Sequence, residues 1–191
     1  SDLSPNKWGT VRLSSRNATA VNRKKYLDTG NIQDVNFEML MTAEIAGHWR
    51  GLRVEAAYLA DNVHIEKGVE NNTTKHYDGT YVQAGMLLFG GSQNYDYGGA
   101  EFTRITPGRS WGDVELCARF DRLDLDSQGV YGGAANAWAL GVNYYVNPNI
   151  KFMLNWQYVK NNKYANGNGK LVVGYNAEGA PTTNPADIAP D

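Results

Sequence analysis

The sequence lacks most of the features that allow a function to be assigned directly. It contains one cysteine, Cys117, so an intrachain disulfide framework cannot form. The formal net charge of −2 provides no electrostatic basis for binding nucleic acid. No apolar run approaches the roughly 18 residues that a transmembrane helix requires. The chain is therefore not expected to be a disulfide-stapled domain, a nucleic-acid-binding protein or a helical membrane protein.

Residues suited to catalysis or metal binding are also scarce. The three histidines, His48, His64 and His76, have no partners at metal-ligand spacing. The stretch Asp124-Leu125-Asp126, followed by Gly129, resembles the start of a calcium loop but lacks the closing glutamate. We therefore expect no enzyme activity, no metal site and no cofactor.

The sequence does contain long stretches in which apolar and polar residues alternate. Residues Ile150–Lys160 read IKFMLNWQYVK, with an apolar residue at every second position. A period of two is typical of a strand with one apolar and one wetter face. Seven stretches of this kind are found at Trp8–Ser14, Val35–Trp49, Leu52–Tyr58, Tyr81–Leu88, Asp113–Asp121, Trp138–Val146 and Ile150–Tyr158.

Strand length and loop length both favour a membrane barrel. Most of these stretches run for about ten residues, the length that a tilted strand needs to cross a bilayer, whereas ordinary strands average five or six. Short and long connections alternate, as in outer-membrane barrels. The tight turns are Arg50-Gly51 and Asn147–Asn149, the long polar loops are Ser15–Asp34, Asp61–Gly79 and Asp126–Asn136, and the Gly-rich stretch Gly90–Gly112 is an exception. We predict an all-β protein, an up-and-down antiparallel transmembrane β-barrel represented by about seven long strands.

Several stretches resemble the phosphate-selective porin O and P family. Trp111–Leu125, WGDVELCARFDRLDL, resembles the Trp-Gly-x-x-Glu-Leu-x-x-Arg strand opening of that family. Asn136–Val159, NAWALGVNYYVNPNIKFMLNWQYV, resembles its Leu-Gly-x-Asn-Trp-Tyr-x-Asn-Pro-Asn hairpin and the strand that follows. Gly51–Leu59 and Tyr81–Gly91 resemble two earlier strands, although Gly90-Gly91 replaces a Gly-Glu pair. The resemblance extends from Trp8 to about Val159.

This resemblance implies a fold, a location and a set of partners. Family members are outer-membrane channels of about sixteen strands that work as homotrimers. Residues 1–160 would then supply the C-terminal half of a barrel without its final strand, and residues 161–191 a loop-like tail. The protein would be about twice the length of this chain. Its partners would be outer-membrane lipid and a small solute or an anion such as phosphate, in the outer membrane of a bacterial cell.

Alternation also predicts which charged residues face the channel. The expected lumen-facing charged residues are Arg12, Arg53, Arg119, Lys151 and Glu115. A basic cluster in the first long loop comprises Arg16, Arg23, Lys24 and Lys25. Acidic residues outnumber basic ones on the predicted inner face, so phosphate selectivity does not follow from the sequence. The wall could instead be charge-balanced, and the basic cluster could steer anions, contact lipid headgroups or be an ordinary solvated loop.

A soluble protein remains the alternative. A secreted all-β carbohydrate-binding module would use exposed Trp and Tyr side chains as platforms for sugars. A soluble sandwich explains the alternation but not the length of the strands.

Overall fold

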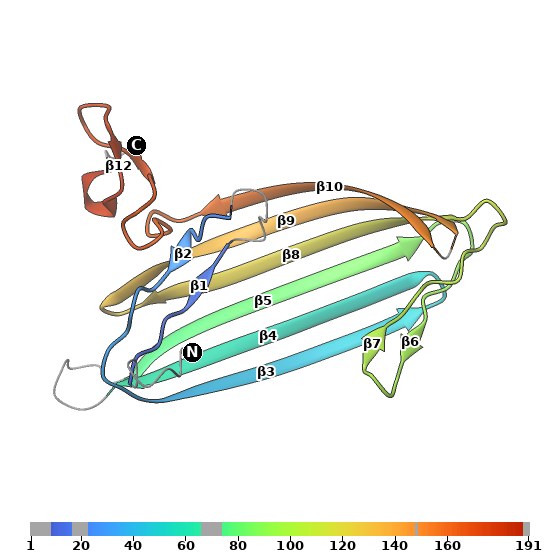
Figure 1. Cartoon of the computed structure of the whole chain (residues 1–191), viewed down its shortest axis with the longest axis horizontal. Helices are drawn as coiled ribbons and strands as arrows, with labels where there is room; N and C mark the ends of the chain where they lie inside the picture. The colour runs from blue at the N-terminus through green and yellow to red at the C-terminus, as the bar shows by residue number, and fades with distance from the viewer. Residues whose placement is uncertain (1–8, 17–22, 66–73, 148, 189–191) are drawn as a thin grey trace.

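The computed structural model describes residues 9–16, 23–65, 74–147 and 149–188, and a curved antiparallel sheet dominates it (Figure 1). The sheet order is β10-β9-β8-β5-β4-β3, so each long strand lies beside its neighbour in the chain. The all-β and antiparallel parts of the prediction are confirmed, and the six strands form an open sheet. Their bounds are β3 (Val35–Trp49), β4 (Leu52–Ile65), β5 (Thr74–Leu87), β8 (Asp113–Ser127), β9 (Val130–Asn147) and β10 (Ile150–Asn161).

The turns between strands lie at alternating ends of the sheet, as an up-and-down order requires. β3 and β4 are joined by Arg50-Gly51, where Arg50 adopts a positive φ of 52°. At the same end, Asn147 Oδ1 accepts hydrogen bonds from two backbone N–H groups of the β9–β10 connection. The pairing register places the Gln128-Gly129 turn, between β8 and β9, at the opposite end.

The predicted loop from Asp126 to Asn136 is wrong. β8 continues to Ser127 and β9 already begins at Val130, so a two-residue turn connects them. The start of β9 is rich in glycine and alanine, which weakens the sequence signal for a strand. These small residues are needed because other segments pack closely on them: a Cβ at Gly133 would overlap the backbone of Ala165.

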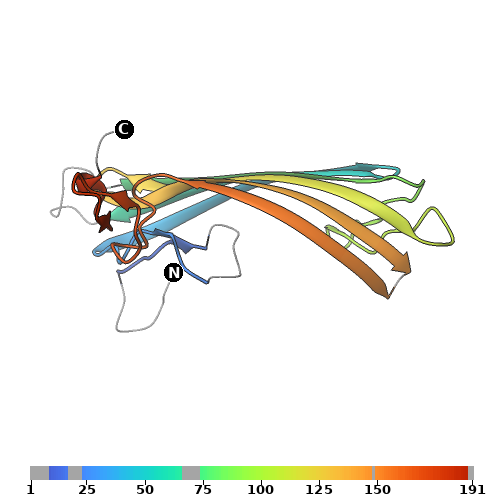
Figure 2. The same ribbon diagram turned by 90° about the horizontal axis from the view of Figure 1, so that it is seen from above.

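The first predicted strand, Trp8–Ser14, is also wrong as a member of the sheet. Trp8 lies outside the described residues. Val11 forms a single bridge with Ile32, and β1 (Ser14–Ser15) pairs only with β2 (Leu27–Asp28). This N-terminal segment (residues 9–16 and 23–34) lies across the concave side of the sheet instead of extending it (Figure 2).

A small apolar core explains the position of the N-terminal segment. Leu27 is fully buried against side chains of the sheet, among them Val63 and Leu125. The alternation of Val11 and Leu13 therefore reflects packing onto the sheet, and not contact with lipid. The complete cluster of buried residues is Val11, Leu27, Ile32, Val63, Tyr77, Leu125, Ala135 and Ala165.

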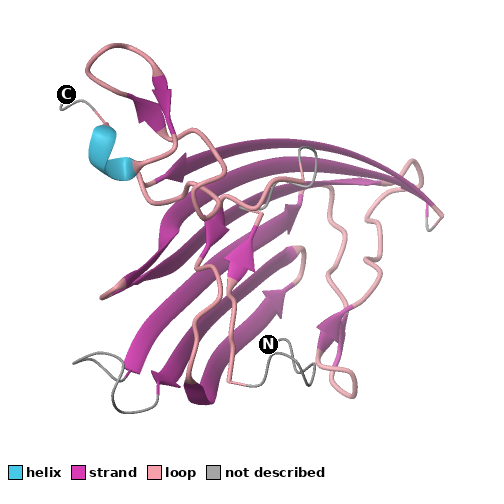
Figure 3. Cartoon of the chain, turned by 60° about the vertical axis from the view of Figure 1, so that its left-hand side comes forward, coloured by secondary structure: helices cyan, strands magenta, loops and turns pink. Residues whose placement is uncertain are grey.

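The first residues of the C-terminal tail pack onto the sheet, where Ala165 is buried in the apolar cluster. The rest of the tail extends beyond the end of β10 (Figure 3). It contains the short hairpin β11 (Gly174–Tyr175) and β12 (Pro181–Thr182), followed by a 3-10 turn, η2 (Pro185–Asp187). Within the described residues, no helix is long and apolar enough to span a membrane.

Candidate functional site

One face of the sheet carries most of its polar side chains. The register aligns Arg53, Gly85, Cys117, Gly141 and Asn155 in one row across five strands, so their side-chain positions share this polar face. A cavity of about 460 Å³ lies on it. Four predicted residues line that cavity: Arg53, Glu115, Arg119 and Lys151.

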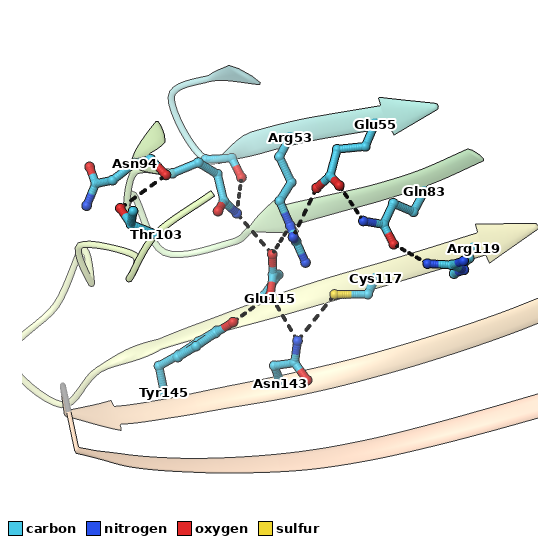
Figure 4. Close-up of polar contacts among 12 residues, drawn as sticks. Arg53, Glu55, Gln83, Asn94, Thr103, Glu115, Cys117, Arg119, Asn143 and Tyr145 are labelled. Carbon is cyan, nitrogen blue, oxygen red and sulfur yellow. Dashed lines mark hydrogen bonds and ion pairs between the residues drawn. The ribbon is translucent and has the colours of Figure 1, made fainter. Parts of the chain in front are cut away.

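A continuous chain of polar contacts crosses the polar face (Figure 4). Arg53 Nε donates to Glu115 Oε1 at 3.0 Å, and Arg53 Nη1 lies 3.4 Å from Glu55 Oε1. Glu55 accepts a hydrogen bond from the Gln83 amide, whose oxygen accepts one from Arg119. Arg119 in turn pairs with Asp121 at 2.5 Å. Both arginines on this face therefore have carboxylate partners.

Gly85 makes room for the Arg53–Glu115 pair. A Cβ at this position would lie 2.5 Å from Glu115 Oε1 and 2.8 Å from Arg53 Nε. Because both contacts are shorter than a real Cβ tolerates, even alanine would push the two charged groups apart. The glycine is thus required by the ion pair above it.

The segment between β5 and β8, residues 88–112, folds back over the polar face and is called the excursion below. It carries the short hairpin β6 (Tyr95–Asp96) and β7 (Glu101–Phe102). Phe102 lies against the Arg53 guanidinium, with 5.8 Å between the guanidinium carbon and the ring centroid. His48 of β3 packs against the Phe102 ring with centroids 6.0 Å apart. The excursion thus narrows the space above the sheet.

Asp113 holds the base of the excursion. It is completely buried, and its two carboxylate oxygens accept four backbone hydrogen bonds. The donors are the N–H groups of Phe89, Gly91, Gly108 and Val114, at 2.8 to 3.0 Å. The sequence alone could not reveal this role of Asp113, because the donors lie up to 24 residues away.

The other predicted basic residues differ in their surroundings. Lys151 Nζ lies 5.5 Å from the Tyr145 ring centroid, and no carboxylate among the described residues forms an ion pair with it. The basic cluster belongs to the N-terminal segment, where Lys25 Nζ donates to Ser14 Oγ at 2.9 Å. All four of its members, Arg16, Arg23, Lys24 and Lys25, are exposed.

Arg12 does not belong to the wall of the sheet, contrary to the sequence prediction. Its guanidinium forms two hydrogen bonds with Asp28, at 2.8 and 2.6 Å, within the N-terminal segment. Burial raises the pKa of Asp28, but hydrogen bonds from Arg12 and the Gly30 N–H outweigh it, so the pKa lies below its ordinary value. The ion pair therefore links the two parts of the N-terminal segment, residues 9–16 and 23–34, to each other.

This arrangement predicts how the N-terminal segment responds to acid. Because the folded-state pKa of Asp28 is depressed, its stabilisation is present above its unfolded-state pKa and disappears as the pH falls through the folded-state value. Amide protection factors at Val11 and Ile32, measured by hydrogen exchange, should be constant at pH 5–7 and fall below about pH 4. The variant Asp28→Asn should lose about tenfold in protection at neutral pH and lack this acid transition. An unchanged acid transition in the variant would contradict this role.

The opposite, apolar face of the sheet exposes large hydrophobic side chains. Leu154 is 74% exposed and Ile45 73%. Along β8, apolar positions continue to Phe120 and then give way to Arg122 and Asp124, which pair at 3.5 Å. At this border Phe120, Trp138 and Tyr158 form an aromatic row, with neighbouring centroids 5.5 and 5.7 Å apart.

A second group of aromatic residues lies at the other border of the apolar face. Trp111 contacts Phe89 and Tyr144, with ring centroids 4.8 and 6.4 Å apart. An apolar band flanked by aromatic residues at both edges is the pattern of a lipid-facing barrel wall. In the described part of the chain, no cluster of three or more His, Cys, Asp or Glu side chains could hold a metal ion.

Comparisons with known proteins point to one family. The sequence profile of the family described as phosphate-selective porin O and P matches residues 4–179. An uncharacterized protein of Caulobacter vibrioides is 24% identical over 164 residues, which cover 78% of this chain and 31% of that protein. Porin O of Pseudomonas aeruginosa is 31% identical over 101 residues, which cover 48% of this chain and 23% of that protein. The chain thus matches less than a third of the length of either relative. No solved structure matches it significantly.

Proposed function

The chain belongs to the phosphate-selective porin O and P family, and from this premise we propose that it forms part of the wall of a bacterial outer-membrane channel. In this proposal, small hydrophilic solutes diffuse passively along the polar face. The main support for this proposal is that the sheet has two different faces. Paired charges and amides lie on one side, and an exposed apolar band lies on the other. The full protein would close this sheet into a barrel with further strands.

The apolar face of the sheet also indicates what surrounds the channel. Outer-membrane lipid would cover the apolar face, because side chains such as Leu154 and Ile45 would otherwise remain in water. Part of that face could instead contact sister subunits, and a homotrimer is our proposal for the assembly. Passive diffusion requires no cofactor and no catalytic residue.

The described half of the wall does not favour phosphate as the specific solute. A selective anion channel needs cations that are free to interact with the ion. Arg53 and Arg119 both have carboxylate partners, which leaves Lys151 as the polar-face cation without an ion pair among the described residues. We therefore propose a general channel with weak ion preference. Arg12 and the basic cluster of residues 16–25 contribute only through the N-terminal segment.

The soluble carbohydrate-binding module is less well supported. Strands of 12 to 18 residues and a continuous exposed apolar band would be unfavourable on a soluble module.

Diffusion of sugars of increasing size into liposomes tests the proposed function. We expect the full-length protein to admit monosaccharides quickly and larger oligosaccharides progressively more slowly, because a water-filled path sorts solutes by size. Liposomes without protein are the control. No uptake of any sugar by liposomes that contain folded protein would contradict the proposal.

A further inference from the structure

Glu115 is a charged residue that its neighbours cover almost completely. Its side chain is 1% exposed, although it lies on the polar face. It accepts hydrogen bonds from Arg53, Gln93, Asn143 and Tyr145, at 2.8 to 3.0 Å. All these donors surround one carboxylate, so Glu115 acts on the channel through its neighbours and not by direct contact with ions.

We propose that Glu115 sets the ion selectivity of this part of the channel, as a positioning residue that neutralises Arg53 and ties the excursion to the wall. The proposal rests on the proposed channel function. It also means that Arg53, which the sequence places on the channel side, does not act as a free cation in the native protein.

Arg53 and Glu115 differ in how far they are exposed to solvent. The Arg53 side chain is 27% exposed, so a passing ion meets the guanidinium with the Glu115 carboxylate directly behind it. Glu55 is a weaker partner, because it lies 3.4 Å away, is 20% exposed and also accepts a hydrogen bond from Gln83. A buried carboxylate at 3.0 Å is screened less by water than an exposed one, so Glu115 cancels most of the field of Arg53.

Glu115 also holds the excursion against the wall. Gln93 Nε2 donates to Glu115 Oε1 at 3.0 Å and to the Gly51 carbonyl at 3.3 Å, so its side chain joins the excursion to both β8 and the β3–β4 turn. Phe102 of the excursion lies against the Arg53 guanidinium, with the guanidinium carbon 5.8 Å from the ring centroid. Loss of the carboxylate would free Arg53 and loosen the excursion together.

The test measures reversal potentials of the full-length protein in planar bilayers across a tenfold KCl gradient. Glu115→Gln should raise the chloride-to-potassium permeability ratio roughly threefold, the effect of one unmasked unit charge several ångströms from the ion path. Arg53→Gln alone should lower the ratio, because it leaves the Glu115 carboxylate without its compensating charge. The double variant should return close to the wild-type ratio, because both charges of the pair are then absent.

The double variant separates neutralisation of Arg53 from an effect of the excursion alone. If Glu115→Gln shifted the ratio only by loosening the excursion, the double variant would keep that shift, and that result would overturn the proposal. Glu115→Asp keeps the charge but withdraws it from Arg53, so it should give a smaller shift in the same direction. An unchanged ratio in folded Glu115→Asp and Glu115→Gln would also refute it. Absence of conductance in the wild-type protein would instead contradict the channel function.

Discussion

Replacing Leu154 by arginine is expected to lower the free energy of unfolding of the membrane-inserted protein by about 2–4 kcal/mol. Leu154 is 74% exposed, lies opposite Val142 on β9, and is flanked on the same face by Phe152 and Trp156. If this face contacts lipid, the guanidinium must enter hydrocarbon or distort the bilayer around it. The loss should appear as a lower denaturant midpoint in reversible unfolding from lipid vesicles.

The adjacent position provides the matched control. Asn155 lies on the polar face and lines the cavity of about 460 Å³, so Asn155→Arg places the same charge in water. Its effect on the unfolding free energy should stay within about 1 kcal/mol. Equal losses at positions 154 and 155 would refute the assignment of the two faces.

Asp113→Asn is the second variant with a large expected effect, a loss of about 3 kcal/mol in the free energy of unfolding. The carboxylate accepts four backbone N–H groups, and an amide can accept only on its oxygen. Its NH₂ group would face backbone donors in a fully buried site. The amides of Gly91 and Gly108 should exchange with solvent much faster, because both depend on Asp113.

An aspartate at the tip of the excursion serves as the control for Asp113. Asp96 accepts a hydrogen bond from the Gly98 N–H at an exposed position, so Asp96→Asn should change the unfolding free energy by less than about 0.5 kcal/mol. A similarly small effect of Asp113→Asn would show that the base of the excursion does not depend on its carboxylate.

Alternation predicted the central strands because it is a local property of the chain. Leu154 and Asn155 take opposite faces whatever the rest of the protein does, and the same holds along β4 and β8. The prediction failed where a second layer covers the sheet. Val11 alternates like a strand residue but packs onto the polar face, and the small residues at the start of β9 hide a strand because they allow close packing there.

The charge pairing of the site could not be predicted from the sequence. Arg53 and Glu115 are 62 residues apart, and the alternation of side chains along their strands shows only that the two residues share a face. Their register, and the glycine at position 85 between them, are properties of the assembled sheet. Gln93 lies in a Gly-rich stretch without periodicity, so nothing in the sequence indicated that it would contact Glu115.

The central claim is that the polar face meets water and the apolar face meets lipid. Its most direct test is labelling of single cysteines along β10 with a membrane-impermeant thiol reagent, in the full-length protein inserted in membranes and with Cys117 replaced by serine. The account predicts that cysteines introduced for Met153, Asn155 and Gln157 are labelled, whereas those for Phe152, Leu154 and Trp156 are protected. Uniform labelling at all six positions, or the reverse alternation, would contradict it.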